Sequence, residues 1–333
     1  MEEIKKLNST TRIEEIDLLK AFGIILMIMG HIGFGNIFDV WIHSFHMPMF
    51  FIISGFLWKR KHTSFKLFFE KKFFSLLIPY FIFSVFHLMV WIIIQFLTIK
   101  YIDFTSVVSA VYHIFLFNTE GMPICGALWF LTALFFVNIF YFSIDKIKNK
   151  HLKYIVIILL SLAGCIIPRY FRLPLGIDIS LMGVGLFQIG TILKKNVEVF
   201  KIETNIYTVF LCVLLGSVIC FYNSSINIRN GVYGNIILYY ICASLMTIGW
   251  YAFFRLFFRW NTLRRIMTYI GKNSIVYLCL NQLLLLPFNK ICLLVSHNYI
   301  LVIVKIIILF LTLVILRIFS FLINKNFKWI LGK

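Results

Sequence analysis

The stretch IEEIDLLKAFGIILMIMGHIGFG, residues 13–35, decides the fold. After an acidic start it stays mostly apolar for about the 20 residues that a helix needs to cross a hydrocarbon core about 30 Å thick. The whole chain of 333 residues has the same character, with 61% hydrophobic and 14% charged residues and a mean hydropathy of +0.93. Soluble proteins carry about 25% charged residues. Lipid must therefore be the main solvent.

Further apolar runs predict an all-α polytopic helix bundle with about ten transmembrane helices. We place the helices near residues 16–35, 38–58, 73–98, 125–144, 154–172, 175–193, 204–222, 232–258, 270–290 and 298–324. The runs are too long and too continuously apolar for an outer-membrane barrel. Pro48 and Pro287 fall inside predicted spans and should kink them. We expect one domain over residues 1–333, with no fused soluble domain.

The formal charge of +19, from 32 Lys and Arg against 13 Asp and Glu, would point to nucleic acid in a soluble protein. With the N-terminus inside, only six of the 32 cations fall in outer segments: Lys100, Arg169, Arg172, Arg229, Lys290 and Lys305. Because inner loops of membrane proteins are enriched in Lys and Arg, this bias predicts that both termini are cytoplasmic. Most of the positive charge is then explained by the orientation of the helices in the membrane, and nucleic acid is not an expected partner.

Ionisable residues inside a membrane are costly, so those of the first helix are functional candidates. Asp17 and Lys20 are three residues apart and can neutralise each other. Lys20 and His31 are eleven apart, which is three turns plus about 20°, so they share one stripe with about 16 Å between their levels. The alternative is that Lys20 extends to the membrane surface and His31 is a hydrogen-bonded packing residue.

The second span, in WIHSFHMPMFFIISGFLWKRK at 41–61, adds more histidines. His43 and His46 follow Asp39 and are three residues apart, so they can face His31 across the first hairpin. A zinc site from these three histidines and Asp39 is conceivable. No recognised metal spacing is present, so we favour acid–base work by a histidine and expect no metal.

Lys20 and His31 reproduce the hallmark of the membrane-bound acyltransferase family 3, a Lys or Arg followed by ten residues and a His in the first span. Four further segments resemble the family: FHMPMFFIISGFLW at 45–58, FEKKFFSLLIPY at 69–80, GALWFLTALFF at 126–136 and GKNSIVYLCLNQ at 271–282. Together they cover roughly residues 12 to 290, in order. One departure concerns the last segment, where many members have a His and this chain has Asn281 and Gln282.

The resemblance implies an integral-membrane O-acyltransferase, a multi-pass protein of the cell membrane, and in a bacterium of its cytoplasmic membrane. Such enzymes move an acetyl group from cytoplasmic acetyl-CoA to a hydroxyl of an extracytoplasmic or lipid-linked glycan. Acetyl-CoA is then a co-substrate, and no tightly bound cofactor is expected. Acyl-CoA, a glycan or lipid-linked sugar and membrane lipids are the expected partners.

The inner loops offer cations for the phosphates of CoA. Lys20 is the more specific candidate for orienting the donor, and the wider set is Lys59, Arg60, Lys61, Lys71 and Lys72. The alternative for each of these lysines and arginines is a role in topology or in binding lipid headgroups.

Attack of a hydroxyl on a thioester needs a base and a donor for the developing oxyanion. His31 is our candidate for the general base, or for a transient acyl carrier, and Lys20 and Asp17 complete the catalytic set. We expect the remaining candidates to bind or orient the acceptor: His43, His46, Asp39, Trp129, Asn281 and Gln282. Packing is the alternative for the two histidines, and a simple interfacial aromatic is the alternative for Trp129.

The sequence does not decide the roles of two features on the outer side. The connection 99–124, with Asp103, His113 and Glu120, could cap an acceptor pocket. Asp178 is isolated in the sixth span, and pairing with Arg169 or Arg172 is its structural alternative.

Two other classes of function fit a polytopic chain. A proton-coupled transporter or flippase is compatible with intramembrane His and Asp, but no pair of equivalent halves is visible. A polymerase of lipid-linked sugars would need more outer cations to hold a pyrophosphate.

Overall fold

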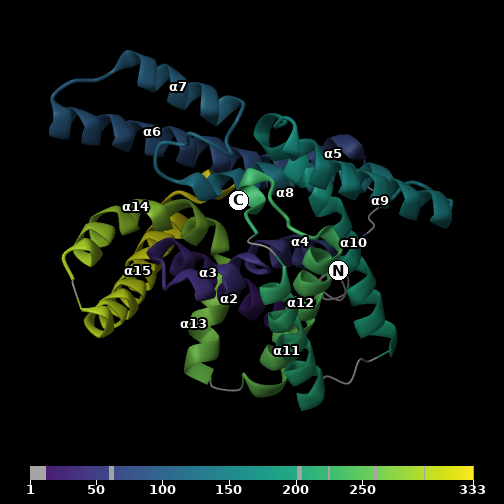
Figure 1. The fold of residues 1–333 in the computed structure, drawn as a ribbon. Helices are drawn as coiled ribbons and strands as arrows, with labels where there is room; N and C mark the ends of the chain where they lie inside the picture. The colour runs from purple at the N-terminus through teal and green to yellow at the C-terminus, as the bar shows by residue number, and fades with distance from the viewer. Residues whose placement is uncertain are drawn as a thin grey trace, which may run out of the picture.

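The structure is a computed structural model that describes residues 13–59, 64–200, 205–223, 226–258, 261–295 and 297–332. Within these ranges the chain is helical with short connections, and the β pairing is one isolated bridge, Asn227 to Val232. The all-α polytopic bundle predicted from the sequence is confirmed (Figure 1).

The helices of the first half are α2 (Glu14–Ile32), α3 (Asn36–His43), α4 (His46–Phe56), α5 (Phe65–Lys72), α6 (Ile78–Ile99), α7 (Phe104–Phe115) and α8 (Trp129–Ile144). Those of the second half are α9 (Lys150–Ile166), α10 (Ile177–Phe200), α11 (Ile206–Tyr222), α12 (Ile236–Phe257), α13 (Asn261–Lys272), α14 (Ser274–Leu293) and α15 (Asn298–Asn326). Among the described residues, eight helical segments are long and apolar enough to cross a membrane. Of the other two expected spans, α2 carries several charges and α11 has 17 residues.

The second predicted span is broken into α3 and α4 at Ser44 and Phe45. Phe45 has φ −143° and ψ −23°, which is not helical. Pro48 lies in the first turn of α4, where a missing N–H removes no hydrogen bond of the helix. The break therefore lies ahead of Pro48, and a kink at Pro48 itself was the wrong prediction. Helix α14 continues through Pro287.

The predicted span 270–290 is also divided, because α13 ends at Lys272 and α14 begins at Ser274. Asn273 separates them with ψ 21°, and its side chain donates to Tyr269 O at 2.8 Å. Asn324 of α15 donates to Asn273 Oδ1 at 3.0 Å. The junction is thus held by side-chain hydrogen bonds, and α13 is a separate helix beside the start of α2.

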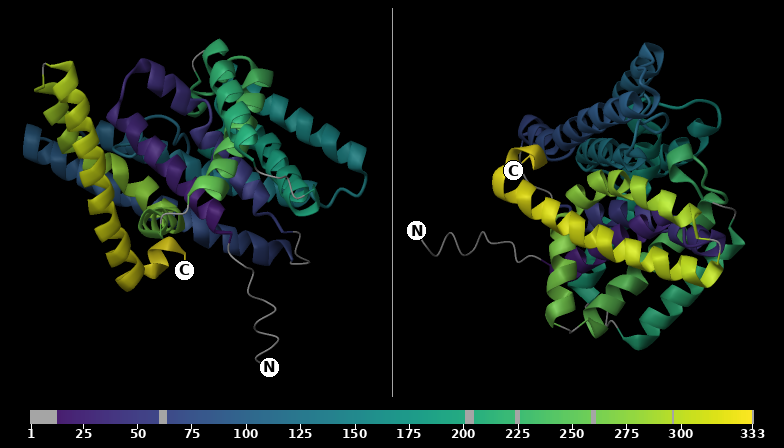
Figure 2. Two further views of the ribbon diagram at one scale, coloured as in Figure 1. Left: turned by 90° about the horizontal axis from the view of Figure 1, so that it is seen from below. Right: turned by 90° about the vertical axis from the view of Figure 1, so that its left-hand side faces the viewer.

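Helix α2 lies at the centre of the bundle and packs against α4, α12, α13 and α14. Figures 1 and 2 show α2 between later parts of the chain. A second packing centre joins α4 to α10. Gly55 and Gly190 lie so close to the opposite backbone there that a Cβ atom on either would overlap it. Small residues allow this close approach, which is a common way of packing helices in membranes.

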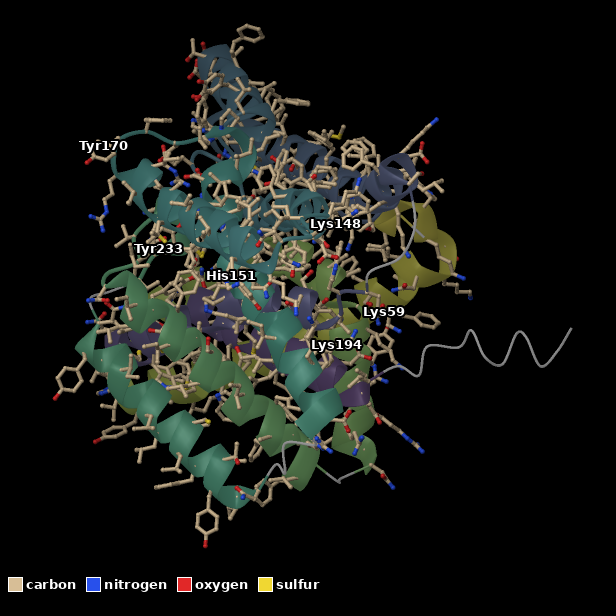
Figure 3. All side chains as sticks on the ribbon, turned by 90° about the vertical axis from the view of Figure 1, so that its right-hand side faces the viewer. Lys59, Lys148, His151, Tyr170, Lys194 and Tyr233 are labelled. Atoms are coloured by element: carbon tan, nitrogen blue, oxygen red, sulfur yellow. The ribbon has the colours of Figure 1, made fainter. Side chains whose placement is uncertain are left out.

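Residues predicted on one side of the membrane contact each other. Lys194, which is predicted to lie inside, donates to Trp58 O at 3.0 Å at the inner end of the second predicted span. Trp58 Nε1 donates at 3.2 Å to Asp145, which directly follows the fourth predicted span. In Figure 3, Lys59, Lys148 and Lys194 lie on one side of the molecule, and Tyr170 and Tyr233, which are close to the predicted outer cations Arg169 and Arg229 in the sequence, lie on the other. Both ends of the chain reach residues outside the described ranges, so their cytoplasmic location stays a prediction.

The outer connection 99–124 forms α7 beside α6 (Figure 1). Asp103 caps the first turn of α7. Hydrogen bonds from Ser106 and Thr105 lower the pKa of Asp103 to about 2. Tyr80 Oη of α6 donates to Ile114 O of α7 at 2.5 Å. Asp103 is thus accounted for as a capping residue.

Candidate active site

His31 lies in the last turn of α2, and its ring is half-buried. Its Nδ1 atom is 3.2 Å from Nε2 of Gln282 on α14. Its Nε2 atom is buried, and no hydrogen-bond partner for it exists among the described residues. A polar atom buried without a partner is costly, which makes it a candidate for contact with a substrate.

Gln282 links His31 to the turn that precedes α8. Its Oε1 atom accepts the backbone N–H of Ala127 at 3.3 Å, while its Nε2 atom faces His31. The neighbouring Asn281 turns back onto its own helix and donates to Tyr277 O at 3.0 Å and to Leu278 O at 2.7 Å. Of the two candidates on α14, Gln282 reaches His31 and Asn281 does not.

His43 on α3 packs against the end of α2. Its Cε1 atom lies 3.6 Å from the position that a Cβ atom of Gly30 would take, and it interacts electrostatically with His31. The rings of His43 and His46 are perpendicular, with centroids 5.3 Å apart. His46 is buried and donates from Nδ1 to Ile42 O at 2.8 Å. The structure thus gathers the three imidazoles, as the spacing predicts.

Asp39 is half-buried in the same region, and its Oδ1 atom has no hydrogen-bond partner among the described residues. His43 and Lys305 are the titratable groups that interact electrostatically with it. Lys305 of α15 donates to Gly33 O in the turn between α2 and α3. Within the described ranges, no three His, Cys, Asp or Glu side chains are placed to hold a metal ion, so the zinc alternative has no ligand cluster there.

Arg229 is a neighbour of His31 that the sequence interpretation did not select. It lies between α11 and α12, interacts electrostatically with His31, and donates from Nε to Thr119 O at 2.5 Å. Burial lowers its pKa. Arg172 donates to Arg229 O at 2.8 Å and pairs with the buried Asp178 at 2.5 Å. Asp178 is thus paired with Arg172, which is one of the two partners that the sequence analysis gave as its structural alternative. Arg229 belongs to none of the sequence motifs. Its predicted location on the outer side was the only sequence feature that could have suggested a role near His31.

Lysines collect near the inner end of α2. Lys20 pairs with Asp17 at 3.8 Å. Lys72, half-buried at the end of α5, interacts electrostatically with Lys20 and Lys71. The structure therefore brings together three of the predicted donor-binding cations on two helices. Lys59 is exposed, and Arg60 and Lys61 lie outside the described residues.

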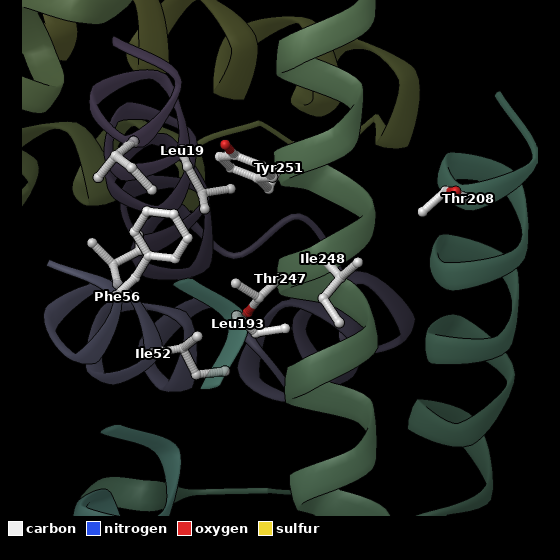
Figure 4. A pocket seen from close by; sticks show the side chains of 10 residues that line it. Leu19, Ile52, Phe56, Leu193, Thr208, Thr247, Ile248 and Tyr251 are labelled. Carbon is white, nitrogen blue, oxygen red and sulfur yellow. The ribbon is translucent and has the colours of Figure 1, made fainter. Parts of the chain in front are cut away.

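A small apolar cavity lies beside this inner end, between α2, α4, α10, α11 and α12 (Figure 4). Leu19, Phe56, Thr247 and Tyr251 are among the side chains that line it. Its volume of about 40 Å³ has room for only a few water molecules. The cavity is therefore far too small for CoA.

A larger hollow of about 560 Å³ lies at the outer end, beside the turn between α2 and α3. Phe34, Phe38, Trp41 and Phe221 provide aromatic walls, together with polar groups such as Ser217. Trp41 Nε1 donates to Ser217 Oγ at 2.9 Å. The volume is in the range of small-molecule sites. On α3, Phe38 and Trp41 line this hollow, and His43 of the same helix packs against α2.

Trp129, the first residue of α8, is only 4% exposed and belongs to the hydrophobic core. Its ring lies 5.8 Å from that of Phe130. This burial fits an apolar wall better than a face on which a sugar stacks.

Lys20 lies near the inner end of α2 and His31 near its outer end, as the spacing of the two residues predicts. The sequence model of a family described as "Acyltransferase domain" matches residues 13–321. Neither a curated protein nor a solved structure matches the chain. The match covers nearly the whole chain, and the helices identify a multi-pass membrane protein. The chain therefore belongs to the membrane-bound acyltransferase family 3.

Proposed function

We propose that this acyltransferase moves an acetyl group from cytoplasmic acetyl-CoA to a hydroxyl of an extracytoplasmic or lipid-linked glycan. The observation that supports this most directly is the buried Nε2 atom of His31, which has no partner among the described residues and lies beside His43. A group of this kind is ready to hydrogen-bond a reacting carbonyl or hydroxyl.

The inner lysines are suited to the donor. CoA carries several phosphate charges, and Lys72, which faces the cations Lys20 and Lys71, gains from an arriving anion. Lys20 and His31 share one stripe of α2, which provides a path along the helix from the phosphates of the donor toward its thioester.

The outer hollow is suited to the acceptor. Its aromatic walls, Phe34, Phe38, Trp41 and Phe221, offer the flat apolar faces on which sugar rings pack, and Ser217 offers a hydroxyl. Helix α3 then connects an acceptor bound there with His43.

The test is the O-acetyl content of surface glycans in cells with and without the gene, and in cells that carry His31→Ala. We expect O-acetyl groups only with the unaltered gene. The matched control is His151→Ala, which removes an exposed histidine at the start of α9 (Figure 3) and should preserve acetylation. Equal acetylation in the His31→Ala cells would contradict the proposal. Movement of the glycan across the membrane without acetylation would favour the transporter.

A further inference from the structure

The hydrogen bonds around His31 and His43 hold the two rings in opposite tautomers. A backbone N–H group only donates and a backbone carbonyl only accepts, so each fixes the role of the group that it contacts. The N–H of Ala127 plays this part on the His31 side, and the carbonyl of Asp39 plays it on the His43 side.

On the His31 side, Gln282 lies between the N–H group of Ala127 and the imidazole, so the orientation of its amide determines which nitrogen of His31 is protonated. Ala127 N–H donates to Gln282 Oε1, which leaves the NH₂ group of Gln282 facing His31 Nδ1 at 3.2 Å. Because an NH₂ group donates and does not accept, Nδ1 must be the nitrogen without a proton. A neutral His31 then carries its proton on Nε2, the buried atom that has no partner among the described residues.

His43 has the reverse arrangement. Its Nδ1 atom lies 2.6 Å from Asp39 O, and a carbonyl oxygen requires a proton on that nitrogen. The Nε2 atom of a neutral His43 therefore keeps a lone pair, and no described residue donates a hydrogen bond to it. The two neighbouring rings thus offer a donor and an acceptor.

We infer that His31 is the hydrogen-bond donor of the reaction, that His43 is its base, and that Gln282 is the positioning residue that sets this division. The inference rests on the proposed acetyl transfer. The hydroxyl oxygen of the acceptor attacks the thioester carbon, and its proton passes to His43 Nε2. The carbonyl oxygen becomes an oxyanion that accepts the hydrogen bond of His31 Nε2–H. The carbon–sulfur bond then breaks, and the leaving thiolate takes the proton from His43.

The same tautomer argues against an acyl-histidine intermediate. The lone pair of His31 Nδ1 is engaged by Gln282, and Nε2 holds the proton, so neither nitrogen is a free nucleophile. The acetyl group passes directly from sulfur to the acceptor oxygen. This assigns to His43 the role of base that the sequence alone suggested for His31.

The first test reads the tautomers in the unaltered protein. Nitrogen NMR of protein labelled in its histidine rings, purified in detergent, distinguishes protonated from bare ring nitrogens, and His31→Gln and His43→Gln assign the signals. We expect His31 protonated on Nε2 and His43 on Nδ1. A proton on Nδ1 of His31 overturns the inference. This measurement requires no acetyl transfer, so it stands apart from the proposed function.

The second test is Gln282→Glu, which replaces the NH₂ group by a carboxylate oxygen. That oxygen accepts a proton from His31 Nδ1 and so reverses the tautomer. We expect kcat for CoA release, measured with acetyl-CoA in glycan-containing membrane vesicles, to fall about 100-fold with an unchanged KM for acetyl-CoA. An unchanged or higher kcat overturns the inference, because a carboxylate partner is what a histidine base uses.

Gln188→Glu is the matched control. Gln188 of α10 accepts a hydrogen bond from Tyr141 Oη at 2.5 Å, and the same substitution there places a carboxylate inside the bundle without contact to a histidine. We expect it to retain kcat. If the unaltered protein releases no CoA, the proposed function fails, while the NMR measurement still decides the tautomers.

Discussion

His31 of α2 and Gln282 of α14 are 251 residues apart in the chain, yet their side-chain nitrogens lie 3.2 Å apart. The contact joins the first and the ninth predicted spans at the candidate reacting group. Gln282 also accepts from Ala127 at the start of the α8 region, so three distant segments determine how one imidazole is held. This part of the site therefore forms only when these three segments have packed together.

The cluster of Lys20, Lys71 and Lys72 predicts how the donor is bound. Lys72→Ala should raise the KM for acetyl-CoA about tenfold with a smaller change in kcat, because a charge-assisted contact to phosphate is lost. Lys72→Glu should have a larger effect. The control is Lys150→Ala, which removes an exposed lysine at the start of α9. If Lys72→Ala and Lys150→Ala give the same KM as the unaltered protein, Lys72 does not bind CoA.

The aromatic hollow predicts separate effects on the acceptor. Phe38→Ala should raise the KM for a glycan acceptor several-fold and leave the KM for acetyl-CoA unchanged, since Phe38 lines the outer hollow and not the lysine cluster. Initial rates measured while each substrate is varied in turn will separate the two constants. A rise in the KM for acetyl-CoA alone would place the donor, not the acceptor, in this hollow.

The ion pair of Arg172 and Asp178 predicts a loss of stability. Arg172→Met leaves the buried Asp178 carboxylate without its partner, and removing one member of such a pair costs about 3–5 kcal/mol. Thermal unfolding in detergent should show a clear drop in Tm. The double variant Arg172→Met with Asp178→Leu should recover much of it, because no uncompensated charge is then buried. A double variant as unstable as Arg172→Met would contradict this explanation.

The close approach of α4 and α10 predicts a strict requirement for glycine. Gly190→Ala places a Cβ atom against the backbone of Ile52, where nothing can move aside, so little folded protein should be recovered. Gly30→Ala is the matched helix variant, because its new Cβ atom would meet only His43 at an ordinary contact distance. Size-exclusion profiles in detergent compare the two. Equal recovery of both proteins would show that the α4–α10 contact is looser than described.

Most of the bundle could be predicted because a membrane helix must supply its own backbone hydrogen bonds and an apolar surface, and both requirements are visible in single segments. The stripe that joins Lys20 to His31 could be predicted for the same reason, since helical periodicity fixes it. The break at Ser44 and Phe45 and the separate helix α13 could not be predicted. Phe45 lies inside the continuous predicted span 38–58, and Asn273 is held by Asn324 of the distant α15.

The residues that reach the site from distant segments of the chain could not be predicted from the sequence either. Adjacent residues on a helix point about 100° apart, so only one of Asn281 and Gln282 could face His31, and the packing of α14 decides which one. Arg229 and Lys305 reach the site from a loop and from the last helix. Neither position shows a pattern, because their role depends on how distant helices pack.

The most direct test of acetyl transfer uses inside-out membrane vesicles and acetyl-CoA that carries one label in the acetyl group and another in CoA. We predict that the acetyl label appears in the glycan as an alkali-labile ester, that an equal amount of labelled CoA stays outside the vesicles, and that His31→Ala abolishes both products. Glycan that crosses the membrane without releasing CoA, or ester formation that persists in the His31→Ala protein, would contradict the account.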